Sequence, residues 1–289
     1  MRSAQRVECV GRAVLVTGAT PGSLGFETAR ALRAWGADVV VTARRDPAAA
    51  AGALGEGVAG YQLDLSDAGS VARFVAAYGD DVGRLDVLVN NAGVHLDLRS
   101  SWTEPALTPD GYEIHWRTNY LGTAHLTHLL LPLLSGASDA RIVNVVSKLH
   151  RRAVNADLFT PRRPYDSWAA YGASKLALVH HAFELQRRCA PVQGYALHPG
   201  AVYTHIADRG LQGHRVLGAL RRALAPVERL MLLSPEDGAQ TSLHCASAPG
   251  LAGGRYLRDC APAEPSPDAL DADVSARLWD ATTAWITTL

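Results

Sequence analysis

The chain has 289 residues, of which 28 are Lys or Arg and 28 are Asp or Glu, so its net charge is zero and nucleic-acid binding has no electrostatic support. Its four cysteines, spread from Cys9 to Cys260 without a C-x-x-C pair, predict free thiols in a reducing compartment, with no metal or disulfide framework. No secretory signal and no apolar run of the ~20 residues needed for a membrane helix are found, so we expect a cytoplasmic protein without a membrane span.

Strand and helix patterns alternate along most of the chain. The expected strands are Ala13–Thr17, Asp38–Thr42, Gly60–Leu63, Leu85–Val89, Arg141–Val146 and Val192–Leu197. The expected helices are Phe26–Trp35, Asp67–Tyr78, Pro109–Leu134 and Trp168–Cys189. This β-α-β order predicts a single α/β domain over residues 1–289, a Rossmann fold with a doubly wound parallel sheet of about seven strands and helices on both faces.

Three segments lack strand patterns: residues 148–167, residues 201–233 and the tail after Asp259. The first two follow the fifth and sixth strands, at the edge where open α/β sheets bind ligands. We therefore expect both to form walls of the substrate site. We also expect residues 201–233 to be mobile without ligand and to close over the substrate as a lid.

A glycine-rich turn, Thr17-Gly-Ala-Thr-Pro-Gly-Ser-Leu-Gly25, joins the first strand to the first helix. Glycines let backbone N–H groups approach a pyrophosphate, and the N-terminus of the following helix favours its negative charge. The turn therefore predicts a dinucleotide site. The residues of this turn expected to contact the cofactor are Gly18, Thr20, Pro21, Gly22, Ser23, Leu24 and Gly25.

The end of the second strand indicates which dinucleotide is bound. An acidic residue at this point would hold the ribose 2′-hydroxyl of NAD, but the chain has Arg44 and Arg45. A guanidinium can bind a 2′-phosphate through paired, charge-assisted hydrogen bonds, so NADP(H) is favoured. The alternative is that the two arginines are only a solvated pair at the surface.

Tyr171 and Lys175 are four residues apart in an expected helix, so they share one face of it. Lys175 is one of only two lysines in the chain, the other being Lys148. An ammonium beside a phenol favours the phenolate, so we expect Lys175 to lower the pKa of Tyr171 and to make it an acid–base catalyst.

Together these motifs resemble the short-chain dehydrogenase/reductase family over most of the chain. The matching motifs are the glycine turn, Asp64-Leu65, Asn90–Gly93, Asn119, Ser147, Tyr171-x-x-x-Lys175, and Pro199-Gly200 followed by Thr204. The chain is most similar to the retinol-dehydrogenase-like branch. That similarity is carried by Asn119–Gly122, Thr127–Pro132, Tyr165–Ala170, Pro262–Ser266 and the long spacing from Ser147 to Tyr171.

The resemblance implies a role for each matching residue. Asp64 and Leu65 would flank the adenine, and Asn91, Ala92 and Gly93 would line the ribose and nicotinamide side. The residues that would hold the nicotinamide ring are Pro199, Gly200, Val202 and Thr204. The catalytic residues would be Asn119, Ser147, Tyr171 and Lys175, with Tyr171 and Lys175 also at the cofactor and Asn119 holding a water beside Lys175. The chain departs from the family's motifs at two points. The glycine turn has an extra residue between Gly22 and Gly25, and Val146 stands where the family often has a serine.

The leading hypothesis is an NADPH-dependent carbonyl reductase or alcohol dehydrogenase. Its small-molecule substrate would be a bulky lipophilic ketone, aldehyde or alcohol, such as a polyketide of secondary metabolism, and a homo-oligomer is compatible with the sequence. One alternative is a reductase of conjugated carbon–carbon bonds. Another is a regulatory protein that senses NADPH without turnover, which the intact Ser147, Tyr171 and Lys175 disfavour. We interpret His150, His180, His181 and His198 as surface or packing residues rather than metal ligands.

Overall fold

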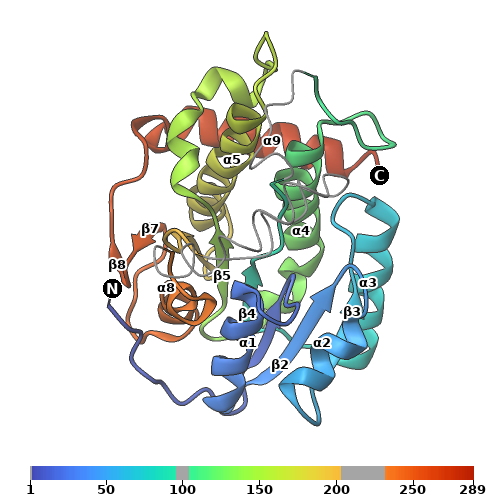
Figure 1. Cartoon of the computed structure of the whole chain (residues 1–289), viewed down its shortest axis with the longest axis vertical. Coiled ribbons are helices and arrows are strands. Elements are labelled where there is room, and N and C mark those ends of the chain that lie inside the picture. Colours follow the sequence, from blue (N-terminus) through green and yellow to red (C-terminus); the bar gives the residue numbers. More distant parts are fainter. Residues whose placement is uncertain (1, 96–103, 203–231) are drawn as a thin grey trace, which may run out of the picture.

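Eight strands form one sheet in the order β3-β2-β1-β4-β5-β6-β7-β8, parallel except for the last pair (Figure 1). The strands are β1 Ala13–Val16, β2 Asp38–Ala43, β3 Ala59–Gln62, β4 Val87–Asn90, β5 Arg141–Val145, β6 Gln193–His198, β7 Arg255–Arg258 and β8 Ala261–Pro262. The computed structural model describes residues 2–95, 104–202 and 232–289. These residues form a Rossmann-like α/β domain, which confirms the expected fold class.

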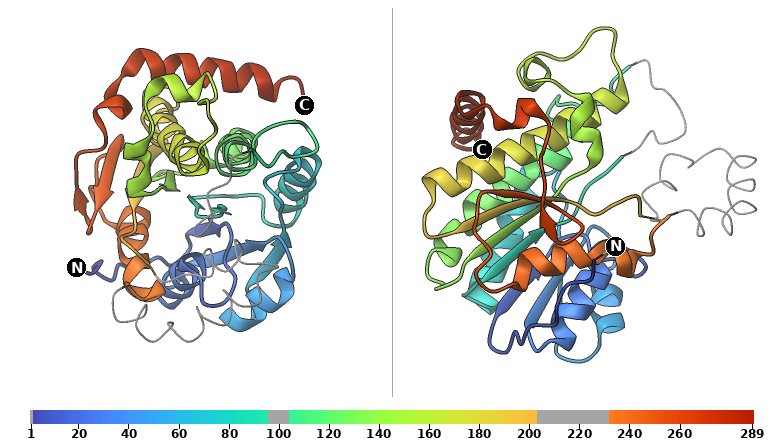
Figure 2. Two further views of the ribbon diagram at one scale, coloured as in Figure 1. Left: turned by 45° about the horizontal axis from the view of Figure 1, so that its top comes forward. Right: turned by 90° about the vertical axis from the view of Figure 1, so that its left-hand side faces the viewer.

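Helices cover both faces of the sheet (Figure 2). The α-helices of the described residues are α1 Leu24–Ala34, α2 Pro47–Leu54, α3 Ala68–Asp81, α4 Gly122–Leu134, α5 Ser167–Arg188, α8 Pro235–Ser247 and α9 Ala272–Ile286. A π-helix, η1 Trp116–Leu121, leads into α4, and the 3₁₀ helices are η2 Lys148–Arg152, η3 Asn155–Leu158 and η4 Pro267–Leu270. No helix in this described part is long and apolar enough to cross a membrane.

The core has two sides because successive residues of a strand point to opposite faces. In β1, Val14 and Val16 pack with residues of α1, α2 and α8, whereas Leu15 packs with residues of α3 and α4. All three side chains are buried. The alternation places the sheet between two helical layers. The carboxyl ends of β1 to β7 meet at one edge because these strands are parallel.

The helix expected at residues 109–134 begins later, at Trp116. Gly111 adopts a φ of +83°, which interrupts a helix, and Leu107 pairs with Glu113 in an isolated antiparallel bridge. Asp110 accepts hydrogen bonds from Thr108 and Arg117 instead of continuing a helix. The start of the predicted helix was therefore wrong, while its end at residue 134 is confirmed.

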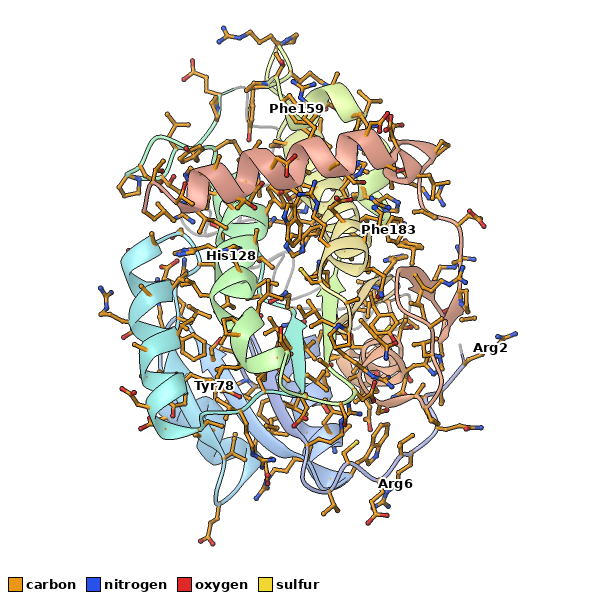
Figure 3. The ribbon with its side chains drawn as sticks, turned by 180° about the vertical axis from the view of Figure 1, so that it is seen from behind. Arg2, Arg6, Tyr78, His128, Phe159 and Phe183 are labelled. Carbon is orange, nitrogen blue, oxygen red and sulfur yellow. The ribbon has the colours of Figure 1, made fainter. Side chains whose placement is uncertain are left out.

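The tail after Asp259 contains structure that its sequence pattern does not indicate. Asp259 and Cys260 have φ of 52° and 55°, and this tight reversal returns the chain as the short antiparallel strand β8. Helix α9 then crosses the outer side of α4 and α5 (Figure 3). It is anchored by a 2.6 Å hydrogen bond between the hydroxyls of Tyr120 and Thr282 and by stacking of His181 on Trp279.

Most of the expected lid, residues 201–233, lies outside the described residues. Its two ends are adjacent, because the backbone N–H of Leu233 donates to the carbonyl of Ala201 at 2.8 Å. All four cysteines are free thiols, as predicted. Among the residues that the structure describes, no cluster of His, Cys, Asp and Glu could hold a metal ion.

Candidate active site

A cavity of about 410 Å³ lies at the carboxyl ends of the parallel strands. Its lining follows the order of the strands across the sheet, from Arg44 after β2 to Ser147 after β5. Tyr171 and Lys175 line it from α5. This is the edge at which open α/β sheets bind ligands, so the cavity is the candidate active site.

The glycine turn adopts a conformation that other residues would strain. Gly18 has a φ of +69°, and a Cβ on it would lie 2.8 Å from the Cα of Ala92. Gly22 has a φ of +77°, after which Ser23 caps α1 by accepting a hydrogen bond from the backbone N–H of Phe26. The extra residue of the turn is thus accommodated before the helix begins, and Ser23 lines the cavity.

The loop after β4 supports this turn from the side. The Asn91 amide donates hydrogen bonds to the carbonyls of Thr17 at 2.9 Å and Gly18 at 3.2 Å. A Cβ on Gly25 would collide with the same amide at 2.3 Å. Asn91 therefore holds the turn in shape and also lines the cavity.

The two arginines after β2 are placed differently. Arg44 is exposed and lines the cavity, and its guanidinium has no ion pair or hydrogen bond with any of the described residues. Arg45 is exposed but is not part of the lining. Asp64, which lines the same end, accepts hydrogen bonds from the backbone N–H and the hydroxyl of Ser66 at 2.9 and 2.6 Å. The Arg44 guanidinium therefore has no ion-pair partner among the described residues at this end.

Strand β5 and helix α5 bring the three expected catalytic side chains together. The Tyr171 hydroxyl is hydrogen-bonded to the side chain of Ser147. The Lys175 ammonium lies 5.7 Å from the centre of the Tyr171 ring and donates to the carbonyl of Val145 at 3.1 Å. The side chains of Tyr171 and Lys175 are thus neighbours on one face of α5, as their spacing predicts.

The position of α5 depends on its cap and on one glycine. The Asp166 carboxylate accepts from the backbone N–H groups of Trp168 and Ala169, which satisfies the start of the helix. Gly172 then lets α5 approach η2 closely, because a Cβ there would lie 2.7 Å from the carbonyl oxygen of Leu149. This close contact places Tyr171 next to the residues that follow β5.

Burial shifts the pKa values of the two candidate catalytic residues, Tyr171 and Lys175, in opposite directions. It raises the pKa of Tyr171 to about 12, and the hydrogen bond with Ser147 only partly opposes this. It lowers the pKa of Lys175 to about 8. The pKa of Tyr171 is thus raised, whereas from the sequence we expected it to be lowered, because loss of hydration is the largest cause of its shift. Tyr171 carries its proton at neutral pH.

Asn119 is fully buried in η1 and does not line the cavity. Its Oδ1 accepts from the Val94 N–H at 2.7 Å, and its Nδ2 donates to the Val94 carbonyl and the Ser174 hydroxyl. It therefore clamps the loop after β4 to α5. A Cβ on Gly93 would lie 3.2 Å from both Asn119 Oδ1 and Lys175 Nζ, so the three groups meet at one point. The water that the resemblance implies beside Asn119 stays a prediction.

The cavity gathers most of the predicted site residues. Those in its lining are Gly18, Thr20, Ser23, Leu24, Arg44, Asp64, Leu65, Asn91, Ala92, Gly93, Ser147, Tyr171, Lys175, Pro199, Gly200 and Val202. Those outside its lining are Pro21, Gly22, Gly25, Arg45 and Asn119. Thr204 lies outside the described residues.

A family model for short chain dehydrogenases matches residues 12–213. The chain belongs to the short chain dehydrogenase family. It is 36% identical to mouse retinol dehydrogenase 14, with 93% of this chain and 84% of that protein covered, and 39% identical to mouse polyprenol dehydrogenase, with 93% and 82% covered. These relatives support the expected retinol-dehydrogenase-like branch.

Two solved structures agree with this assignment. An uncharacterized protein from Mycobacterium paratuberculosis matches with a TM-score of 0.73 and 33% identity over 96% of this chain and 94% of that one. A 3-ketoacyl-(acyl-carrier-protein) reductase from Brucella melitensis, complexed with NADH, matches with a TM-score of 0.65 and 25% identity over 86% and 96%.

This short chain dehydrogenase has a cavity that fits a nicotinamide dinucleotide, the cofactor type of the family. The glycine turn and the N-terminus of α1 border it where a pyrophosphate would bind, and neither Gly18 nor Gly93 could carry a side chain without crowding. The free guanidinium of Arg44 can pair with a phosphate. Gly200, with a φ of +91°, allows the chain after β6 to turn along the opposite side.

Several lining residues, among them His95 and His198, were not predicted as site residues, whereas for Trp168 the sequence leaves a substrate contact and packing at the start of its helix equally open. His95 stacks on Tyr171 with ring centres 4.1 Å apart, and Trp168 contacts His95 edge-on at 4.8 Å. His198, interpreted as a surface or packing residue, lines the cavity at the end of β6. Its position directly before Pro199 is the only signal that could have indicated this. By contrast, His150, His180 and His181 are buried. They are therefore packing residues and not surface residues, the two possibilities that the sequence left open.

Proposed function

We propose that the protein is an NADPH-dependent oxidoreductase that interconverts a ketone or aldehyde and an alcohol on a bulky lipophilic molecule. One observation carries this proposal. Ser147, Tyr171 and Lys175 line the same cavity as the glycine turn, and their hydroxyl and ammonium groups lie beside one another. That arrangement suits a reaction in which negative charge develops on a substrate oxygen.

In the direction of reduction, the nicotinamide cofactor supplies the hydride when bound. The Tyr171 hydroxyl donates its proton to the substrate oxygen, and Ser147 donates a hydrogen bond to the same oxygen. The Lys175 ammonium then stabilises the tyrosinate. The Tyr171 phenol, with its pKa raised by burial, holds at neutral pH the proton that this direction requires.

Arg44 supports the choice of NADPH over NADH. Its guanidinium lies at the end of β2, lines the cavity and has no carboxylate partner among the described residues. A 2′-phosphate would supply that partner, whereas a ribose hydroxyl would leave the charge unpaired.

The aromatic wall beside Tyr171 supports a bulky, largely apolar substrate. His95, Trp168 and Leu149 line this side of the cavity, and the rings of His95 and Trp168 meet edge to face. The names of the relatives, retinol and polyprenol dehydrogenases, point to the same class of lipophilic alcohols. A polyketide of secondary metabolism belongs to this class.

A panel of ketones and aldehydes tests the proposal, with NADPH oxidation followed by absorbance and the products identified by mass spectrometry. We expect at least one bulky aromatic ketone to be reduced to its alcohol. Saturation of a conjugated carbon–carbon bond would replace the proposal by the alternative reductase. Tight NADPH binding without turnover of any carbonyl would favour a nucleotide-sensing protein.

A further inference from the structure

His150 is a fully buried side chain that the chemistry above does not use. It lies on η2, shortly after Ser147. Its Nδ1 is 2.7 Å from the carbonyl oxygen of Ser147, and its Nε2 is 3.0 Å from the backbone nitrogen of Ser266. Its ring also packs against that of Tyr256 in β7, with centres 5.2 Å apart.

The two hydrogen bonds determine the protonation of this ring. A carbonyl oxygen can only accept, so the proton must be on Nδ1, and a backbone N–H can only donate, so Nε2 must be the acceptor. His150 is therefore a neutral imidazole in its Nδ1–H form. Burial lowers its pKa from the usual value, which agrees with the neutral form.

We propose that His150 is a positioning residue that holds the backbone of Ser147 so that the serine hydroxyl faces Tyr171. This rests on the proposed function, because it assigns His150 to the reaction carried by Ser147. The ring is oriented by Ser266, so the segment Pro262–Ser266, which marks the resemblance to the retinol-dehydrogenase-like branch, gains a role at the active site.

The contact can act on the hydroxyl because Ser147 lies where β5 passes into η2. The Ser147 carbonyl accepts two bonds from His150, one from its ring and one from its backbone N–H at 3.1 Å. The Ser147 hydroxyl accepts from the Leu149 N–H at 3.2 Å and is also hydrogen-bonded to Tyr171. A rotation of the Ser147 backbone would break this set and turn the hydroxyl away from the tyrosine.

The chain offers a matched control in His180, which is also fully buried. Its Nε2 lies 3.0 Å from Asn155 Oδ1 and its Nδ1 lies 2.7 Å from the Ser275 hydroxyl. Like His150, it links the region after β5 to the C-terminal segment. Unlike His150, it has no hydrogen bond with Ser147, Tyr171 or Lys175, so its replacement measures the effect on stability of losing such a link.

The experiment compares His150→Phe, His150→Asn and His180→Phe in the full chain. Phe removes both hydrogen bonds while filling the space, whereas Asn retains a short amide donor for the Ser147 carbonyl. The readouts are kcat and KM for reduction of 9,10-phenanthrenequinone, NADPH affinity by fluorescence, melting temperature, and amide hydrogen exchange of the peptide that contains residues 146–150.

We expect His150→Phe to lower kcat about tenfold or more, the scale of a misplaced catalytic group, with NADPH affinity unchanged. His150→Asn should recover part of this loss. The amides of residues 146–150 should exchange faster in His150→Phe but not in His180→Phe. The His180→Phe variant should have a lower melting temperature than the wild type and an unchanged kcat.

Equal kcat in His150→Phe and His180→Phe would overturn the positioning role, as would unchanged exchange of residues 146–150. If the wild type reduces no carbonyl compound, the proposed function fails separately. The exchange comparison alone then decides whether His150 holds Ser147.

Discussion

The two ends of the cavity are built in different ways. The cofactor end consists of a glycine turn with positive φ at Gly18 and Gly22, together with the exposed Arg44. The catalytic end consists of side chains packed between β5, α5 and the residues after them, and Lys175 is only 4% exposed there. The first end presents backbone shape and an accessible charge, whereas the second presents half-buried hydroxyl groups beside a buried ammonium.

This difference has a consequence for substitutions. The exposed Arg44 guanidinium contributes little to the free energy of unfolding. Its removal should therefore change the choice of cofactor and leave stability almost unaffected. Desolvation moves the pKa values of Tyr171 and Lys175 apart, raising the first to about 12 and lowering the second to about 8. Changes at that end should therefore act on the rate and its pH dependence.

The largest effect is expected at the catalytic end. Tyr171→Phe removes the proton donor but keeps the ring that stacks on His95. Turnover should fall by roughly a hundredfold or more, the scale of lost general-acid catalysis. NADPH affinity by fluorescence and the far-UV circular dichroism spectrum should stay as in the wild type. Full activity in this variant would exclude Tyr171 as the donor.

A smaller effect is expected at the cofactor end, where the two arginines form a natural pair for comparison. Arg44→Ala should remove most of the preference for NADPH over NADH, a loss of about 1.5–3 kcal/mol or roughly 10- to 150-fold in affinity. Arg45→Ala should have a much smaller effect, because Arg45 does not line the cavity. Titration of each variant with both cofactors measures this. Equal effects of the two substitutions would contradict the assignment to Arg44.

The pH dependence should show the smallest and most gradual effect. Because burial lowers the pKa of Lys175 to about 8, its charge is present below that pH and lost above it. The value of kcat/KM for carbonyl reduction should therefore decline as the pH rises through about 8, since a neutral amine cannot stabilise the tyrosinate. Lys175→Arg, slower overall but permanently charged, should lack this decline. If kcat/KM of the wild type stays constant up to pH 10, Lys175 is not the group whose titration controls the rate.

Local sequence was sufficient for much of the site. The order of strands and helices, the glycine turn and the shared face of Tyr171 and Lys175 were all predictable, because each depends on neighbouring residues in the chain. The same reasoning missed the late start of the helix before α4, where Gly111 and the Asp110–Arg117 pair interrupt the expected periodicity. It also missed β8 and α9, which follow a turn with unusual φ angles at non-glycine residues.

The sequence by itself determined the fold class, and it predicted the cofactor turn and the candidate reacting groups, since turn chemistry and helical spacing are local properties. Only the tertiary structure decided that Arg44 rather than Arg45 lines the cavity, that burial raises the pKa of Tyr171, and that His150 joins Ser147 to Ser266. Each of these depends on burial or on contacts between residues far apart in the chain, and neither quantity is encoded in any short stretch of it.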